Sequence, residues 1–319
     1  MLAAVLRAYS VIKAKLLNRP LALCDISDVD GIVCAALFRM RYPRGEVVLA
    51  APSDVRGGRL LRSVEWTFVA DLPCPGRALI RADHHASNPP CASREFYDPS
   101  APAAAVLALR ALGLEGVRRA ERLVALAVET DTARIASPEA LALNDAVKGS
   151  GYRGKLRLVE LLAARPLEEV LSDPKVSEAI ERFKRVREAT ERLAAELPPL
   201  ELFVAVFKED LGLSYRHLCI LMERRGSKLT AVVVPRGAFT TRVYLGSASR
   251  DLDVSKVAVR LGGGGHPYAA GATLRSLTRG RAVERILLEL KRFLGLESLD
   301  VVLIDRRGFE VRRWPAVGS

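Results

Sequence analysis

Histidine is rare in this chain, and three of its four histidines lie in two short motifs. The motifs are Asp83-His84-His85 and the run Gly262-Gly263-Gly264-Gly265-His266. Glycine adopts positive φ at no steric cost and lets a ligand approach the backbone closely. Amide N–H groups in such a loop can hold a phosphate, and His266 would add a donor. The run predicts a substrate-binding loop of Gly263, Gly264, Gly265 and His266, with a tight turn and a surface histidine as the alternative.

Carboxylates follow apolar runs at the predicted ends of strands or helices. Asp83 follows the run 78–80, and further acids follow other runs of the first half, namely Asp25, Asp28, Asp30, Asp71 and Asp131. In open α/β sheets, ligands bind beyond the carboxyl ends of the strands. Several carboxylates with a histidine pair predict a site for two cations, with Mn²⁺ favoured and Mg²⁺ or Co²⁺ as alternatives. Any one of these aspartates alone could instead be a helix N-cap or a turn residue.

The ordered set of motifs resembles the DHH phosphoesterase family with a DHH-associated C-terminal domain. That family includes RecJ-type exonucleases, nanoRNase/pAp phosphatases and cyclic di-adenylate phosphodiesterases. The resemblance extends over residues 21–274. The segment 28–31, Asp71, the segment 83–85 and Asp131-Thr132 resemble the four motifs of the first domain in their order. The glycine run with His266 resembles the phosphate-binding signature of the second domain.

The resemblance implies a manganese-dependent hydrolase, a phosphoesterase or exonuclease. It would cleave phosphodiester or phosphomonoester bonds of short oligonucleotides or nucleotides, with two cations supplying hydroxide for the attack. It also implies roles for individual residues: Asp71 bridges the cations, Asp28, Asp30, His84 and Asp131 are further ligands, His85 faces the substrate phosphate, and Asp83 orients the histidines. A RecJ-like exonuclease on longer single strands, a degenerate non-catalytic scaffold that binds nucleic acid in replication, and a pyrophosphatase-like enzyme are the alternatives.

Two positions depart from the family pattern. The first motif usually has a histidine before its first aspartate, whereas Cys24 and Ile26 occupy the corresponding positions here. We expect Asp25 to compensate, because Mn²⁺ prefers oxygen to thiolate, although strand alternation could turn Asp25 away from the site. The second departure precedes the glycine run, where an arginine position holds Gly246. Arg242 and Arg250 are the candidates to supply that charge to the substrate.

Alternating apolar runs and helical patterns predict an α/β protein of two domains. A parallel-sheet domain is expected over residues 1–175, a helical linker over 176–199, and a smaller α/β substrate-binding domain over 200–319, with the active-site cleft between the domains. The predicted strands are 21–23, 47–50, 68–70, 78–80, 202–207, 229–234 and 239–245. A helix over 253–261 should lead into the glycine run, and the segment 301–314 predicts a terminal hairpin.

Charge and composition agree with a polyanionic substrate. The net charge is +12, and residues 198–319 contain 20 Lys and Arg against 12 Asp and Glu. A basic excess in the domain with the glycine run is typical of proteins that bind nucleic acid. The chain has no Gln and three Asn, a composition that predicts a thermophilic archaeon or bacterium as the source.

The sequence also indicates the cellular compartment of the protein. The five cysteines show no CxxC spacing, which argues against a structural zinc site but leaves a disulfide open. Charges interrupt residues 1–17, so that this segment predicts an amphipathic helix rather than a signal peptide. No stretch is long and apolar enough to span a membrane, and a cytoplasmic protein without a membrane partner is expected. The oligomeric state is not predicted.

Overall fold

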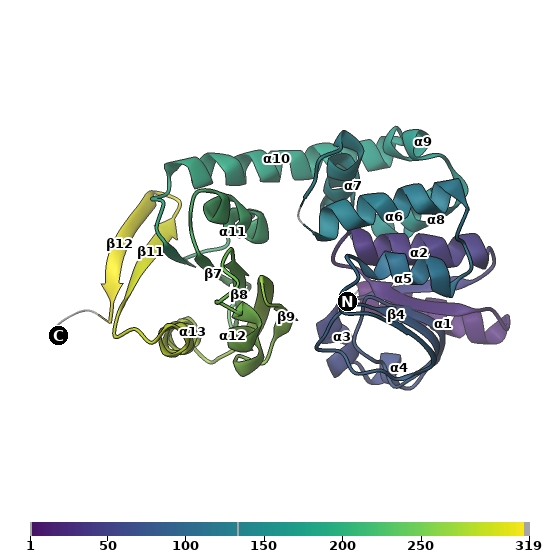
Figure 1. Ribbon diagram of the computed structural model, residues 1–319, viewed down its shortest axis with the longest axis horizontal. Helices are drawn as coiled ribbons and strands as arrows, with labels where there is room; N and C mark the ends of the chain where they lie inside the picture. Colours follow the sequence, from purple (N-terminus) through teal and green to yellow (C-terminus); the bar gives the residue numbers. More distant parts are fainter. Residues whose placement is uncertain (1, 133, 316–319) are drawn as a thin grey trace. The chain divides into compact units, whose positions relative to one another are not determined.

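The chain folds into two compact units. The computed structural model describes residues 2–132 and 134–315 (Figure 1). Unit 1 comprises Met1–Lys184 and unit 2 comprises Arg185–Ser319. The division falls inside the long helix α10 (Pro174–Glu196), which occupies most of the predicted linker.

Unit 1 is built on a five-stranded sheet in the order β2-β1-β3-β4-β5, with every neighbouring pair parallel. This confirms the predicted parallel sheet. The strands are β1 (Leu21–Asp25), β2 (Glu46–Ala50), β3 (Glu65–Ala70), β4 (Arg77–Asp83) and β5 (Ala92–Tyr97). The sequence did not predict β5, because it is an edge strand in which no residue is fully buried and no apolar run marks it.

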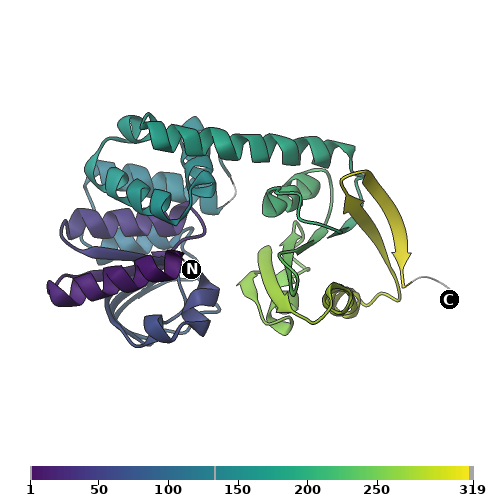
Figure 2. The ribbon, with the colours of Figure 1, turned by 180° about the vertical axis from the view of Figure 1, so that it is seen from behind.

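Helices cover both faces of this sheet (Figures 1 and 2). One face packs against α1 (Leu2–Leu16), α3 (Pro52–Gly57) and α4 (Arg59–Arg62). The other face packs against a larger helical layer, and the core there is made of small and branched apolar side chains. Its helices are α2 (Val29–Arg41), α5 (Ala104–Ala111), α6 (Arg118–Asp131), α7 (Pro138–Gly149), α8 (Tyr152–Ala164) and α9 (Leu167–Leu171).

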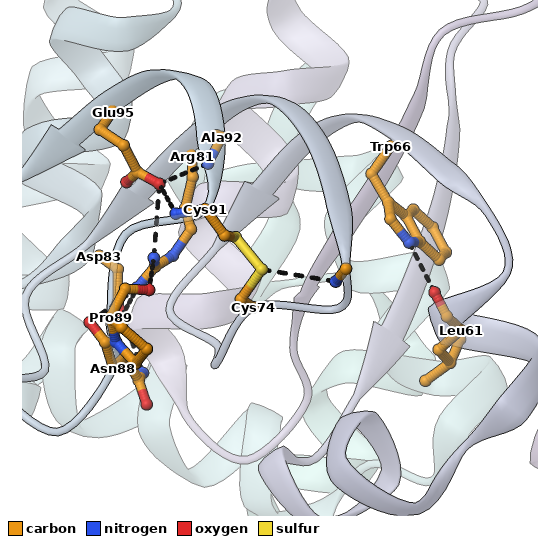
Figure 3. Close-up of a disulfide and its surroundings, with 11 residues drawn as sticks. Leu61, Trp66, Cys74, Arg81, Asp83, Asn88, Pro89, Cys91, Ala92 and Glu95 are labelled. Carbon is orange, nitrogen blue, oxygen red and sulfur yellow. Dashed lines mark hydrogen bonds and ion pairs between the residues drawn. A yellow bond between two sulfur atoms is a disulfide. The ribbon is translucent and has the colours of Figure 1, made fainter.

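A disulfide joins the loop that follows β3 to the loop that precedes β5. Cys74, just after β3, is bonded to Cys91, just before β5 (Figure 3). The bond ties together the loops that follow Asp71 and the Asp83-His84-His85 motif. The remaining cysteines, Cys24, Cys34 and Cys219, are buried thiols.

Unit 2 contains a seven-stranded mixed sheet in the order β12-β11-β6-β7-β8-β10-β9. The strands are β6 (Leu202–Phe207), β7 (Leu229–Pro235), β8 (Thr240–Ser247), β9 (Gly264–His266), β10 (Ala269–Arg275), β11 (Leu299–Asp305) and β12 (Gly308–Trp314). One face packs against α12 (Val254–Arg260) and α13 (Arg279–Leu294), and the other against α11 (Tyr215–Arg224) and the end of α10. The predicted terminal hairpin is β11 and β12.

The described residues contain no helix with the length and apolar character needed to cross a membrane.

Candidate active site

Three aspartates meet at one edge of the unit 1 sheet. Asp25 is the last residue of β1, Asp71 follows β3, and Asp83 is the last residue of β4. Because β1, β3 and β4 are parallel neighbours, their carboxyl ends lie side by side. All three side chains are at least 95% buried. The sheet therefore gathers carboxylates that are up to 58 residues apart in the chain.

The turn from β1 into α2 brings a fourth carboxylate to this edge. Asp28 is the N-cap of α2, and its side chain accepts a hydrogen bond from the Gly31 N–H. A Cβ at Gly31 would collide with the backbone carbonyl of Asp25. Glycine at this position lets the first turn of α2 lie directly against the end of β1, so that Asp28 approaches Asp25. Asp28 thus caps a helix and also belongs to the cluster.

Asp71 has an unusual backbone conformation. Its φ is +58°, in the left-handed region that non-glycine residues seldom occupy. Its N–H donates a 3.0 Å hydrogen bond to the Ala82 carbonyl of β4. Such strain persists where the surrounding structure imposes it, and it concentrates at functional sites. Here it turns the Asp71 side chain toward the other carboxylates.

The described acids and histidines of unit 1 form three groups of possible metal ligands, one of which is Asp71, Asp83 and His85. Asp25, Asp28 and Asp71 offer ligand atoms within 4.8 Å of one another, and so do Asp30, His84 and Asp131. His84 Nε2 lies 3.8 Å from Asp30, 3.8 Å from Asp71 and 3.6 Å from Asp131. These separations are too long for hydrogen bonds but match atoms that surround a common cation.

Backbone groups orient the cluster of Asp30, His84 and Asp131. His84 Nδ1 lies 3.0 Å from the Ala101 carbonyl, which can only accept a hydrogen bond, so that Nδ1 is the donor and Nε2 faces the carboxylates. The Asp30 carboxylate accepts hydrogen bonds from the Ala104 and Ala105 N–H groups, at the start of α5. Both side chains are therefore fixed before any ligand binds.

Asp83 orients His85 rather than His84. Its Oδ1 accepts a 2.9 Å hydrogen bond from His85 Nδ1. Its Oδ2 accepts hydrogen bonds from Asn88 and from the fully buried Arg81 (Figure 3). Burial alone would raise the pKa of Asp83, but these partners hold the pKa below its usual value. Burial alone would lower the pKa of His85, whereas Asp83 and nearby carboxylates raise it. The pair therefore favours a carboxylate beside an imidazolium.

Four carboxyl groups of the clusters have pKa values above their usual range, those of Asp25, Asp30, Asp71 and Asp131. Burial raises the pKa of Asp30, and repulsion from Asp131 and Asp28 raises it further. Burial and neighbouring carboxylates likewise raise the pKa values of Asp25, Asp71 and Asp131. A divalent cation would relieve this repulsion and compete with the protons. Oxygen ligands with one imidazole suit Mn²⁺ or Mg²⁺, so the residues present fit the predicted cations.

The altered first motif places oxygen and sulfur on opposite sides of β1. Asp25 belongs to the carboxylate cluster, and its Oδ1 accepts hydrogen bonds from the Ser27 N–H and hydroxyl. Cys24 lies in the apolar core beside α2, where burial raises the pKa of its thiol. Among the described residues no cysteine belongs to a candidate metal group. This geometry supports the expectation that Asp25 takes the place of the family's histidine.

Two lysines that were not predicted from the sequence bind the loop between β1 and α2, at residues 26 and 27. Lys155 Nζ donates a 2.7 Å hydrogen bond to the Ile26 carbonyl, and Lys148 Nζ donates a 2.6 Å hydrogen bond to the Ser27 carbonyl. Burial and the neighbouring Lys148 lower the pKa of Lys155 to about 8. Lysines on α7 and α8 carry no local signal of this contact, because more than 120 residues separate donor and acceptor.

The glycine run of unit 2 is an ordered hairpin. Gly264–His266 forms the edge strand β9, which pairs antiparallel with Ala269–Gly271 of β10. Gly265 has φ +140°, and a Cβ there would lie 2.5 Å from the Ala269 carbonyl. The half-buried His266 stacks on the exposed Tyr268, with ring centroids 5.3 Å apart. The run therefore presents backbone and an imidazole at a sheet edge.

An arginine from another element lies beside Gly246. A Cβ at Gly246 would collide with Glu223 Oε1 and would lie 2.5 Å from Arg216 Nη1, and these two side chains of α11 form an ion pair at 3.3 Å. Strand register places Gly246, Ala269 and His266 in one row across β8, β10 and β9. Arg242 lies over the Tyr244 ring, and Arg250 is exposed after β8. Arg216 thus joins the candidates for substrate binding, and only the tertiary structure points to it.

Comparison with known proteins agrees with the motifs. Residues 204–295 match the model of the DHHA1 domain. Over 236 residues the chain is 29% identical to the bifunctional oligoribonuclease and PAP phosphatase NrnA of Thermus thermophilus, covering 71% of this chain and 68% of NrnA. The chain is therefore similar to proteins of the DHH family. The DHHA1 match lies within unit 2, and in unit 1 Asp83-His84-His85 has the residues of a DHH motif.

Solved structures show the same fold. The pGpG-specific phosphodiesterase PggH of Vibrio cholerae matches with a TM-score of 0.60 at 18% identity, covering 87% of this chain and 99% of PggH. RecJ of Thermus thermophilus in complex with Mn²⁺ matches with a TM-score of 0.53 at 14% identity, covering 97% of this chain and 64% of RecJ. The predicted α/β architecture with two sheets is confirmed.

Proposed function

We propose that the protein is a metal-dependent phosphoesterase acting on short oligonucleotides or nucleotides such as pAp. The observation that carries this proposal is the pair of neighbouring groups, Asp25, Asp28 and Asp71 in one and Asp30, His84 and Asp131 in the other. Burial and mutual repulsion raise the pKa values of Asp25, Asp30, Asp71 and Asp131, and a pair of bound cations would offset that repulsion. The identity to NrnA supports the substrate class.

The unit 1 residues have distinct proposed roles. Two cations, Mn²⁺ in this proposal, would neutralise charge on the phosphoryl oxygens and lower the pKa of the attacking water. Asp71 belongs to one group and lies 3.8 Å from His84 of the other, which suits a bridging carboxylate. His85, held through Nδ1 by Asp83, would present an imidazolium to the substrate phosphate.

In unit 2 the proposed role is substrate binding. Backbone N–H groups of Gly263, Gly264 and Gly265, with the His266 imidazole, would hold a terminal phosphate. Arg216 of α11, which lies beside Gly246 and pairs with Glu223 at 3.3 Å, would donate a hydrogen bond to the phosphate. That the two units act together on one substrate stays a prediction.

The substrate proposal is tested by kcat/KM over a length series of single strands, from dinucleotides to about 30-mers, with pAp measured in parallel and Mn²⁺ present. A single anchoring hairpin contacts only the terminal nucleotides, so efficiency should be highest for the shortest strands. Asp71→Asn protein prepared in the same way controls for contaminating nuclease. Efficiency that rises steadily with length would contradict the short-substrate proposal. Absence of Mn²⁺-dependent turnover would contradict catalysis and favour the alternative of a non-catalytic protein that binds nucleic acid.

Exonucleolytic action on longer single strands is a second candidate, because arginines line a groove between α12 and α13. The groove contains Arg260, Arg281, Arg285 and Arg292 together with Glu284 and Glu289. Glu289 pairs with Arg260 at 2.9 Å and so reduces the charge available to a phosphate backbone. A steep loss of 30-mer affinity with salt, absent for dinucleotides, would favour this candidate.

A further inference from the structure

Helix α1 has an apolar stripe that its own fold leaves exposed. The stripe consists of five side chains that are 54–79% exposed, at positions that alternate in spacing by three and four residues: Leu2, Val5, Tyr9, Ile12 and Leu16. This spacing is the a/d pattern of a coiled-coil seam, in which each side chain packs between those of a facing helix.

The opposite side of α1 is fixed to unit 1. Val11 and Ala14 are buried in the core of the sheet face that α1 covers. Arg7 donates a 2.8 Å hydrogen bond to the Leu49 carbonyl of β2 and pairs with Asp54 at 2.7 Å. The helix is therefore folded and held before any partner arrives, and a partner would not need to induce it.

We propose that α1 is the interface of a homodimer, in which the stripe packs antiparallel against the same stripe of a second copy. A surface that lies flat on lipid usually has a broad apolar face, whereas a narrow a/d stripe matches another a/d stripe. The chain itself offers such a stripe, and a two-fold axis brings the two together with identical contacts on both sides.

The charges on α1 select the antiparallel arrangement. Lys13 and Lys15 lie in the last turn of the helix, and the first turn has no acidic residue. Parallel packing would place the lysines of both copies side by side. Antiparallel packing places the basic end of each helix beside the N-terminal half of the other and opposes the two helix dipoles.

The exposed area is sufficient for a weak to moderate dimer. Five large side chains that are more than half exposed present several hundred Å² per chain, so that pairing would bury on the order of 1,000 Å² in total, near the lower bound of specific interfaces. A stripe of this size exceeds what single scattered surface residues provide.

Oligomeric state tests the proposal independently of catalysis. Sedimentation equilibrium of the full chain should show a monomer–dimer equilibrium with a Kd in roughly the micromolar range. Val5→Glu should give a monomer at every concentration. Ala4→Glu, which introduces the same charge at the adjacent exposed position off the stripe, should leave the dimer intact. Leu16→Glu serves as a second stripe variant, and thermal denaturation checks that each variant folds.

Cross-linking measures the relative orientation of the two α1 helices in the proposed dimer. Leu2→Cys and Leu16→Cys proteins, mixed and treated with a short bis-maleimide, should form mixed dimers in preference to dimers of either variant alone. Preferential cross-linking of like with like would overturn the antiparallel arrangement. A monomer up to about 100 µM, or a dimer that Val5→Glu and Leu16→Glu leave unchanged, would overturn the interface. A monomer that binds anionic lipid vesicles through these residues would assign the stripe to a membrane surface instead.

Discussion

The carboxylate clusters of unit 1 and the glycine hairpin of unit 2 hold their functional groups by different means. In unit 1, Asp30 and Asp83 are buried, and each accepts at least two hydrogen bonds from defined donors. In unit 2, Gly264–His266 is an edge strand with half-buried residues and one neighbouring strand. A charged cluster must be fixed against its own repulsion, whereas a phosphate-binding edge needs only accessible donors. Substitutions should therefore act mainly on turnover and cation content in unit 1, and on substrate affinity in unit 2.

Asp71→Asn should have the largest effect. Removing the charge shared by both groups should lower kcat by about a thousandfold or more, since the cations contribute several kcal/mol to the transition state. Asparagine also tolerates the left-handed backbone at this position, so the fold should persist. Mn²⁺-dependent nucleotide release is the measurement, with Asp300→Asn at an exposed site as the control. An unchanged rate would remove Asp71 from the site.

His266→Ala should weaken substrate binding instead. Loss of a hydrogen bond to a charged phosphate costs about 1.5–3 kcal/mol, which corresponds to a KM increase of roughly 10- to 150-fold. The number of Mn²⁺ ions bound, measured by calorimetry, should not change. His217→Ala is the matched control in the same unit, because His217 pairs with Glu191 and lies outside the hairpin. Loss of a bound ion on His266→Ala would make His266 a metal ligand and erase the contrast between the two units.

Asp25→Asn and Cys24→Ser test which residue at the end of β1 binds a cation. The cluster contains Asp25, whereas Cys24 lies in the apolar core. Asp25→Asn should lose one of two Mn²⁺ ions, and Cys24→Ser should keep both. Metal analysis of the purified variants decides the question. The reverse pattern would make the thiol the ligand, and no loss in either variant would indicate a site completed by water.

The pH dependence of stability should show the smallest effect. Burial raises the pKa values of Asp25 and Asp30 to about 7 in the folded protein, so that between about pH 4 and 7 the folded state holds protons that the unfolded state has released. Stability of metal-free protein should therefore fall as pH rises through this window, with Tm lower by roughly 5–10 °C. Added Mn²⁺ should raise Tm more at pH 7.5 than at pH 5. Equal Mn²⁺ effects at both pH values would contradict cation binding by these carboxylates.

Much of the fold and part of the site could be predicted from local sequence. Short apolar runs identified four of the five strands of unit 1, because buried parallel strands are apolar throughout. The edge strand β5 was not predicted, since a strand with no fully buried residue lacks an apolar run. Asp25, Asp71 and Asp83 were found because they follow those runs, and parallel strands bring their ends together. Asp131 instead ends helix α6.

Contacts between residues far apart in the chain were decided only by the tertiary structure. Packing of α5 against the sheet edge gives Asp30 its N–H donors, and Ala101 rather than Asp83 orients His84. The Arg216 guanidinium beside Gly246 and the Cys74–Cys91 disulfide likewise depend on how elements pack.

The sequence by itself determined which residue types were available and which strands and helices would carry them, because periodicity and strand-end position are local properties. Tertiary packing decided which donor faces which acceptor and which apolar face stays exposed. The α1 stripe illustrates the limit: the sequence predicts an amphipathic helix over residues 1–17, but both the buried and the exposed sides contain apolar residues. The side of α1 that faces the sheet is set by the contacts of Arg7 and Val11. Arg7 binds the Leu49 carbonyl, 42 residues away in the chain, so the orientation of α1 is fixed only when the whole unit folds.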